Sequence, residues 1–441
     1  MKNWSATIAS LIGCIVLCPL ATRADIPEVQ AKSAYDFCRS IGANSAIALR
    51  GETLDKTIEC AKYVGIKWFR SGIEGSPSVK DLIELHKKTG ARFSWSPGSG
   101  GSDLQKLLST ARELSAAGAL LAFEGPNEPN NWGVTYNGKK GGGNESWLPV
   151  AELQRDLYAA VKADPILKTT PVWGISECGA ETDNVGLQYL KIPQGADTVL
   201  PAGTAFSDYA NVHNYIYHGN SPNVEDNKTW HSADPGPKCK VDGLFGEYGI
   251  TWGKHYKGYT EQQLQTLPRV TTETGTTIDG KVTEDVHARN ILTLYLDQFT
   301  RGWSYTGLYL LRDRVDEGGN QQFGLYKPDY TPRKAAVYLH NLTSILADKA
   351  PARKKVSAKI QIDNEPETMH HLLLQKSTGE VYLVLWNEQV HGSTRTTVHF
   401  RNKLTRAMIY DPTIGTEPIV VVENVNVLTV NLTDHPVIIQ L

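Results

Sequence analysis

The sequence predicts an α/β protein in which a (β/α)8 TIM barrel is followed by a C-terminal antiparallel β-sandwich. From about residue 45 to residue 346, short apolar runs alternate with helical stretches, which is the pattern of parallel βα units. After Ala350 the helical periodicity ends, and short segments that alternate with a period of two follow. The chain of 441 residues, 40% of them hydrophobic, is long enough to bury the core of such a barrel.

Eight apolar runs are predicted as barrel strands, which is the number a TIM barrel requires. The helices between them have an apolar face, and two of them end at a glycine, a common helix stop. The predicted strands are Ala46–Leu49, Lys67–Arg70, Arg92–Ser96, Leu120–Gly125, Pro171–Ser176, Tyr209–Tyr215, Arg269–Thr274 and Ser304–Leu311. The predicted helices include Leu54–Val64, Asp81–Thr89 before Gly90, Asp103–Ala117 before Gly118, and Arg333–Leu346 after Pro332.

The tail carries a hairpin signal, in which two alternating segments flank Ser377-Thr378-Gly379. The strands predicted there are Met369–Gln375, Val381–Trp386, Thr396–Phe400, Arg406–Tyr410, Pro418–Val422, Val427–Asn431 and Val437–Leu441. We therefore expect a signal peptide over 1–24, a barrel domain over 25–350 and a β-sandwich over 351–441, with a strand from 25–40 as a candidate addition to the sandwich.

The first 24 residues have the features of a targeting segment. Lys2 gives a basic start, Ile8–Leu20 is apolar, and Ala24 ends a stretch suited to cleavage. We expect a secreted or periplasmic protein, with lipoprotein anchoring at Cys14 as the alternative. No later segment is long and apolar enough to span a membrane. The net charge of −2 argues against a nucleic-acid partner.

Four cysteines remain once the targeting segment is removed. An even number of cysteines in an exported chain predicts disulfides, and nearness in sequence favours Cys38–Cys60 and Cys178–Cys239. Buried free thiols are the alternative. The cysteine spacing fits no structural zinc site, and we expect neither a metal nor a cofactor.

Two glutamates stand where barrel strands end, which is where active sites of such barrels lie. Glu128 follows the fourth strand in Asn127-Glu128-Pro129, and Glu273 lies on the seventh in Thr272-Glu273-Thr274-Gly275. A pair of carboxyl groups can cleave a glycosidic bond, one as proton donor and the other as nucleophile or base. Glu124 is the main rival for the acid, although a buried and paired structural role fits it better.

These residues resemble the retaining β-glycoside hydrolases of clan A. The segments Leu311-Arg312-Asp313, Phe323-Gly324-Leu325 and Thr331-Pro332-Arg333 are most similar to family 39, with family 5 second. The resemblance implies that Glu128 is the general acid/base with a raised pKa, and that Glu273 is the ionised nucleophile.

The resemblance also implies a set of substrate-binding residues. Asn127 would bind the sugar 2-hydroxyl, Arg70 and Tyr215 would contact Glu273, and His213 would line the same floor. Many clan members have a tryptophan at the end of strand eight, whereas this sequence has Tyr309. Trp95 and Trp132 would supply aromatic faces along an open cleft.

The prediction for function is a retaining, endo-acting β-glycoside hydrolase that cleaves a β-linked glycan. A transglycosylase with the same residues is one alternative, and a non-catalytic carbohydrate-binding protein is another. A monomer is the expected oligomeric state.

Overall fold

The computed structural model describes residues 26–71, 75–97, 103–129, 131–143, 145–176, 178–179, 194, 200–201, 203–216, 224–234, 266–316 and 322–441. The predicted signal peptide, the alternative anchor Cys14 and the side chains of Cys178 and Cys239 lie outside these residues. The chain divides into two compact units. The larger contains Arg39–Asn223 and Thr229–Ala336, and the other contains the residues up to Cys38, Val224–Lys228 and Val337–Leu441.

The larger unit is built on a curled parallel sheet of eight strands in the order β6-β5-β4-β3-β12-β11-β10-β9. Single parallel bridges join Phe123 to Val172 and Trp173 to Tyr209, so the predicted fifth strand lies between β6 and the start of β10. The strands are β3 (Ile41–Asn44), β4 (Trp68–Ser71), β5 (Arg92–Trp95), β6 (Leu120–Phe123), β9 (Cys178–Gly179), β10 (Ala210–Asn214), β11 (Arg269–Thr274) and β12 (Trp303–Leu308).

The first predicted strand is wrong. The strand is Ile41–Asn44, and Ala46–Leu49 forms the loop after it, where Ile47 and Ala48 have positive φ. The strand needs Gly42, because a Cβ there would lie 2.1 Å from the indole of Trp68. A glycine weakens the strand signal in the sequence, and this small residue is what lets the indole pack against the strand.

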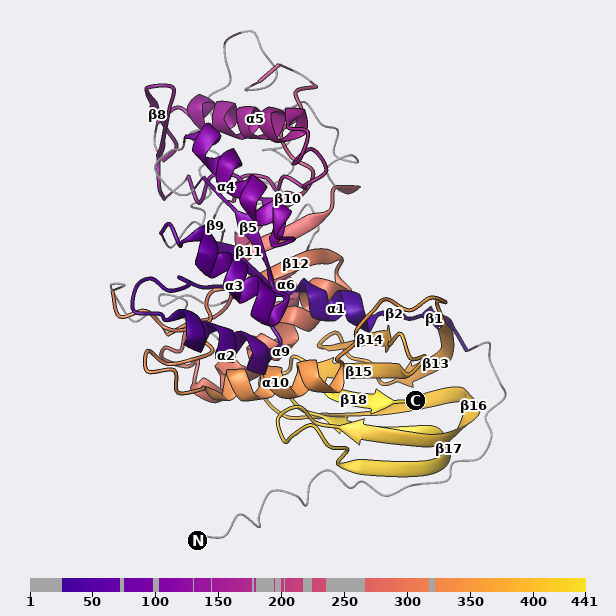
Figure 1. The fold of residues 1–441 in the computed structure, drawn as a ribbon. Coiled ribbons are helices and arrows are strands. Elements are labelled where there is room, and N and C mark those ends of the chain that lie inside the picture. The colour runs from indigo at the N-terminus through magenta and orange to yellow at the C-terminus, as the bar shows by residue number, and fades with distance from the viewer. Residues whose placement is uncertain are drawn as a thin grey trace. The chain divides into compact units, whose positions relative to one another are not determined.

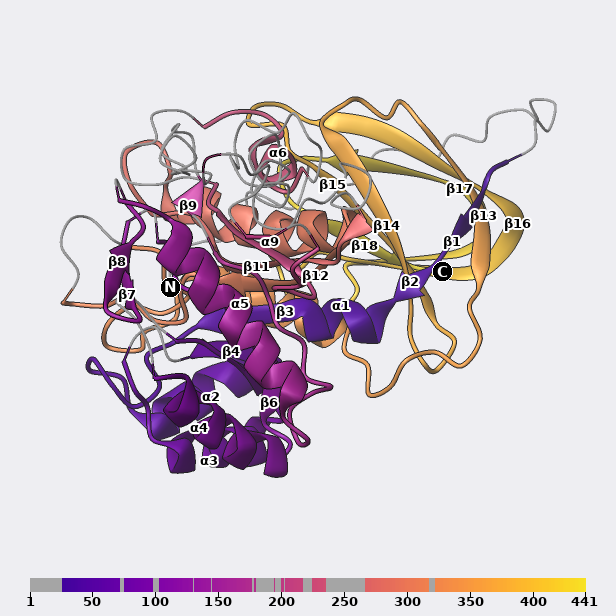
Figure 2. The same cartoon turned by 90° about the horizontal axis from the view of Figure 1, so that it is seen from above.

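The helices of this unit pack in chain order, α2 on α3, α3 on α4 and α4 on α5 (Figures 1 and 2). The Ser78 hydroxyl caps α3 by accepting from the Asp81 N–H, and Gly90 ends the helix in the left-handed conformation. No helix in the described part of the chain has the length and apolar character needed to cross a membrane. Within the described residues the helices are α1 (Ala34–Ser40), α2 (Leu54–Val64), α3 (Val79–Thr89), α4 (Leu104–Ala116), α5 (Leu148–Ala163), α6 (Lys228–Ser232), α9 (Glu284–Thr300) and α10 (Lys334–Ile345).

The second unit contains a mixed sheet of eight strands, in which β17 pairs with β16 beside the path β1-β13-β16-β18-β15-β14-β2. The N-terminal strands belong to it, because β1 pairs with β13 and β2 runs parallel to β14. The strands are β1 (Glu28–Gln30), β2 (Lys32–Ser33), β13 (Ser357–Asp363), β14 (Met369–Gln375), β15 (Val381–Asn387), β16 (Thr394–Tyr410), β17 (Val420–Leu432) and β18 (Val437–Gln440). A small separate hairpin, β7 (Val134–Tyr136) with β8 (Lys139–Gly141), lies in the larger unit.

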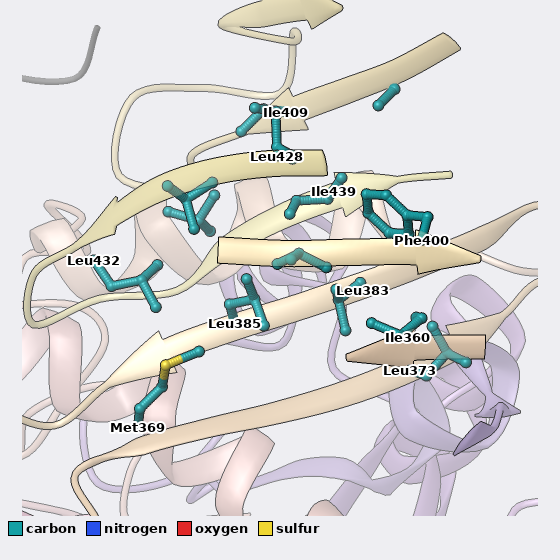
Figure 3. Packing of buried hydrophobic residues seen from close by; sticks show 14 of the residues in the cluster. Ile360, Met369, Leu373, Leu383, Leu385, Phe400, Ile409, Leu428, Leu432 and Ile439 are labelled. Carbon is teal, nitrogen blue, oxygen red and sulfur yellow. The ribbon is translucent and has the colours of Figure 1, made fainter. Parts of the chain in front are cut away.

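Alternate residues of these strands form the core of the second unit. Figure 3 shows Leu383, Leu385 and Ile439 in the same apolar cluster as Phe400 and Leu428. Two pairs of predicted strands are in fact single long strands, since β16 runs from Thr394 to Tyr410 and β17 from Val420 to Leu432. A register shift between His399 and Leu404 lets both strands continue through a polar stretch that reads as a loop.

The predicted Cys38–Cys60 disulfide is absent, because both are free, buried thiols. The Cys38 sulfur lies 3.5 Å from the carbonyl oxygen of Leu346. Burial raises the pKa of Cys60 to about 11, against the hydrogen bond to Tyr326. Each thiol therefore packs against a different, non-cysteine neighbour.

A histidine–aspartate contact makes the second unit sensitive to pH. His435 Nε2 lies 3.1 Å from Asp411 Oδ2, and although burial opposes the charge, Asp411 and Asp434 raise the pKa of His435 to about 9. A raised folded pKa stabilises the fold below the unfolded value near 6.5, and this stabilisation is lost as the pH rises through about 9.

We predict that raising the pH from 6.5 to above 9 removes on the order of 2–3 kcal/mol of stability in the wild type and much less in His435→Gln. Urea unfolding followed through the second unit at several pH values measures this. Equal pH dependence in both proteins would contradict the assignment.

Candidate active site

A buried arginine lies where several strands of the parallel sheet end. The strands whose carboxyl ends meet there are β3, β4, β6, β10 and β11. Arg70, at the end of β4, is 1% exposed. Its Nε lies 2.9 Å from both carboxylate oxygens of Glu124, and its terminal nitrogens donate to Glu273 and, at 2.8 Å, to Asn127. The guanidinium therefore joins residues that are far apart in the sequence, as its fork of donors allows.

Glu273 receives a donor on each carboxylate oxygen. Arg70 donates to Oε1, and the Tyr215 hydroxyl donates to Oε2 over 2.7 Å. Burial raises the pKa of Glu273, and Glu128 adds to this, while His213, Arg70 and Tyr215 act in the opposite direction. The expected contacts of Arg70 and Tyr215 with Glu273 are thus present, but they do not outweigh burial.

Glu128 lies on the turn after β6 in a strained conformation. Its φ is +37°, which costs a residue with a side chain roughly 1–3 kcal/mol. The backbone N–H groups of Asn131 and Trp132 both donate to its carbonyl oxygen and hold the turn. Its carboxylate meets His213 Nδ1 at 2.7 Å, and the amide of Asn131 donates to it over 3.1 Å.

The pKa of Glu128 departs from the sequence-based expectation. The expectation of a partly apolar site implied a raised pKa, and burial does act in that direction. The hydrogen bond and charge of His213, with Asn131 and Arg70, outweigh burial and lower the pKa of Glu128 to about 2. The reason is that the carboxylate faces hydrogen-bond donors, which favour its charged form.

The site contains polar residues that the sequence analysis did not place there. Asn44 donates to the carbonyl oxygens of Thr272 and Leu308. The Thr272 hydroxyl contacts Glu124, which has the buried, paired role foreseen for it. Strand alternation would direct Thr272 and Glu273 to opposite faces, but the register of β11 shifts against both neighbouring strands here. Such shifts re-aim side chains beside functional sites, and alternation in the sequence gives no sign of them.

Aromatic residues lie beside the polar side chains around Arg70 and Glu273. Tyr215 packs edge-on against Tyr309 and Phe323, with ring centroids 6.3 and 5.5 Å away. Tyr309, where many clan members have tryptophan, is therefore part of the wall that supports Tyr215. Trp132 is 57% exposed, whereas Trp95 is 7% exposed and its Nε1 has no partner among the described residues.

Carboxylate and imidazole atoms of Glu128, His213 and Glu273 lie within 4.8 Å of one another, close enough for metal ligands. Both oxygens of Glu273, however, already accept hydrogen bonds, one of them from a guanidinium. A metal ion there would face the positive charge of Arg70. We therefore identify none of these residues as a metal ligand.

Comparison with known proteins finds no matching family profile and no matching curated protein. Solved structures do match. A family 39 glycoside hydrolase from Bacteroides cellulosilyticus WH2 aligns with a TM-score of 0.54 and 13% identity over 93% of this chain and 83% of that one. A family 51 arabinofuranosidase from Xanthomonas axonopodis pv. citri gives 0.56 and 12% over 94% and 99%. A rhamnosyl-glucuronidase from Fusarium oxysporum 12S gives 0.55 and 13% over 96% and 99%.

At these identities the likeness is one of fold. This chain shares its fold with solved glycoside hydrolases of families 39 and 51.

Proposed function

We propose that the chain is a retaining β-glycoside hydrolase in which Glu273 is the nucleophile and Glu128 is the general acid/base. The observation that carries the proposal is the spacing of the two carboxyl groups, since an oxygen of each lies within 4.8 Å of the other. Retaining enzymes need carboxyl groups about 5–5.5 Å apart, whereas inverting enzymes need about 6.5–9.5 Å to admit a water molecule.

The hydrogen bonds to Glu273 fit a nucleophile. A nucleophilic carboxylate must be ionised and held in one orientation. Arg70 and Tyr215 both donate to it, so they stabilise the charged form and fix the carboxylate plane. Both donors can also stay hydrogen-bonded to Glu273 while it loses its negative charge on bonding to the sugar.

The surroundings of Glu128 fit a group that exchanges protons. One of its oxygens faces an imidazole, the side chain best suited to hold or release a proton near neutral pH. Its other oxygen accepts from Asn131, a neutral amide rather than a cation. Glu128 can therefore alternate between acid and base, as the two steps of a retaining mechanism demand.

The proposed substrate is a β-linked polysaccharide or oligosaccharide, cleaved by endo action. Trp132 follows Glu128 on the same turn and exposes much of its ring, so it can stack on a sugar at the leaving-group side. Asn127, whose side-chain oxygen accepts from Arg70, is the proposed partner of the sugar 2-hydroxyl. Trp95 Nε1, which has no partner within the described ranges, offers a donor to a sugar oxygen. The structural neighbours include a bifunctional glucanase-xylanase from a metagenome library.

The proposal also covers the closure of the barrel, the domain bounds, the export of the protein and its oligomeric state. The bridges through Val172 and Trp173 support closure of the parallel sheet into a (β/α)8 barrel. We further propose that the barrel lies within residues 25–350, that the tail forms a β-sandwich joined by the N-terminal strands β1 and β2, and that the protein is exported and monomeric.

We expect Glu273→Gln to reduce hydrolysis of the responsive glycan by roughly 10³-fold or more, because an amide cannot form the glycosyl-enzyme. Reducing-sugar release from a panel of β-linked glycans, using residues 25–441, measures this. In the wild type, NMR of the first product should show the β-anomer. An α-anomer first, or equal activity in both proteins, would contradict the mechanism.

Glu128→Gln should lower hydrolysis of the same glycan by about 10²–10⁴-fold, because the leaving oxygen then departs unprotonated. Formation of the glycosyl-enzyme from an aryl glycoside with an acidic phenol should suffer far less, since that leaving group needs no proton. Burst kinetics with the two substrates gives the comparison. An equal loss in the first step with both would assign Glu128 another role.

Removal of the indole in Trp132→Ala should raise KM for long oligosaccharides several-fold, in line with about 1 kcal/mol of stacking, and leave kcat on an aryl monoglycoside unchanged. Trp147→Ala is unsuitable as a control because Trp147 is buried, so Tyr63→Ala, an exposed aromatic on α2, serves instead. An unchanged KM for long oligosaccharides in Trp132→Ala, equal to that of Tyr63→Ala, would refute the subsite.

A further inference from the structure

The Thr272 hydroxyl, which the proposed mechanism does not use, contacts three polar groups. Its Oγ1 lies 2.9 Å from Glu124 Oε1, 3.1 Å from Asn211 Oδ1 and 3.0 Å from His213 Nε2. All four side chains are buried. A hydroxyl has one proton to donate and otherwise accepts, so the direction of each contact matters.

Two of the three neighbours can only accept. Glu124 is paired with Arg70, whose Nε lies 2.9 Å from both of its oxygens, so it faces Thr272 as a carboxylate. Asn211 presents its amide oxygen, because this atom also accepts from the Thr272 backbone N–H while its nitrogen donates to Gly174. If Thr272 gave its proton to His213, two acceptor oxygens would face lone pairs of the hydroxyl.

We propose that Glu124 and Thr272 are positioning residues that keep a proton on His213 Nε2, so that His213 Nδ1 and Glu128 share the proton used in catalysis. The imidazole donates from Nε2 to Thr272, which donates onward to a carboxylate or amide oxygen. The second ring nitrogen is then free to bind or release a proton. The catalytic role of this shared proton rests on the proposed function. The placement of a proton on His213 Nε2 does not, because it follows from the contacts of Thr272.

The contact between His213 and Glu128 then requires a proton. Nδ1 and Glu128 Oε1 are 2.7 Å apart, so without a proton a lone pair would face a carboxylate oxygen. With one proton the pair is either an ion pair or a carboxylic acid bonded to a neutral imidazole. The pair titrates as one unit rather than as two separate residues.

The stored proton balances both steps of the reaction. In the first, it passes through Glu128 to the glycosidic oxygen as the bond to the anomeric carbon breaks and Glu273 bonds to that carbon. Glu128 is left ionised opposite a bare Nδ1. In the second, water bonds to the anomeric carbon, Glu273 leaves, and the proton from water returns to the pair.

Other charges also face the pair. Glu273 Oε2 lies 3.6 Å from His213 Nδ1 and favours the stored proton, as does Glu124 beyond Thr272. Arg70, which contacts both carboxylates, disfavours it, and Tyr215 is neutral while it donates to Glu273. A change confined to Thr272 leaves these charges in place, so its effect isolates the imidazole.

Thr272→Val tests the proposal, with Thr272→Ser as the matched control that keeps the hydroxyl. In the valine variant the imidazole can move its proton to Nδ1 and donate to an ionised Glu128, so the pair gives up its extra proton more easily. The basic limb of the pH profile of kcat/KM should therefore move to lower pH by about one unit or more. The serine variant should keep the wild-type limb. If kcat/KM of Thr272→Val is lower at every pH but its basic limb stays at the wild-type pH, the proposal is overturned.

A second measurement does not need turnover. Long-range proton–nitrogen NMR of wild-type protein with labelled histidine, with the His213 signals assigned from His213→Gln, reports which ring nitrogen is protonated. We expect Nε2 to carry a proton across the pH range. A bare Nε2 beside a protonated Nδ1 would overturn the proposal, whether or not any glycan is hydrolysed. Failure of the proposed function alone would leave the protonated Nε2 intact.

Discussion

The structure of the site depends on the burial of one guanidinium. Arg70 has almost no exposed surface, so its charge must be compensated by the protein rather than by water. Glu124 and Glu273 supply that compensation, and Asn44 and Asn127 take up remaining donors. Losing one partner of such a buried pair costs roughly 3–5 kcal/mol, because the other charge stays buried. The arrangement around Arg70 is therefore strongly specified, and the orientation of Glu273 with it.

Charge balance explains why the two glutamates have different surroundings. Three carboxylates lie near one permanent cation, so a third negative charge is unfavourable unless another positive charge joins it. Arg70 pairs with Glu124 and Glu273, whereas Glu128 contacts the imidazole of His213, which is charged only when it is protonated. A titratable partner is more useful to a proton-exchanging group than a permanent one, since it lets the net charge change during a reaction. The low pKa of Glu128 and its proposed role as an acid are compatible, because in the proposed mechanism Glu128 shares the proton with His213 across a contact of 2.7 Å.

The sequence predicts most of the larger unit because its signals are local. Helix caps such as Ser78 and Gly90 act within a few residues, and apolar runs mark strands wherever both faces are buried. The failures have non-local causes. Ile41–Asn44 is a strand because Gly42 leaves room for Trp68, and Cys38 and Cys60 stay reduced because each packs against a different neighbour. The long strands β16 and β17 continue through polar residues because each is held by its partner. None of these constraints can be read from a single segment.

The residues of the candidate site also differ in whether a local sequence signal predicts them. Glu128, Glu273, Arg70, His213 and Tyr215 were predicted from strand ends and resemblance, and the structure brings them into contact. Thr272 was missed because the register shift in β11 overrides alternation. The segment from Leu311 to Arg333 gains a physical explanation here. Asp313 accepts from the Gly324 N–H over 2.6 Å and from Arg333, which fixes the loop that carries Phe323 against Tyr215. A motif far from the glutamates in sequence thus supports the tyrosine that orients Glu273.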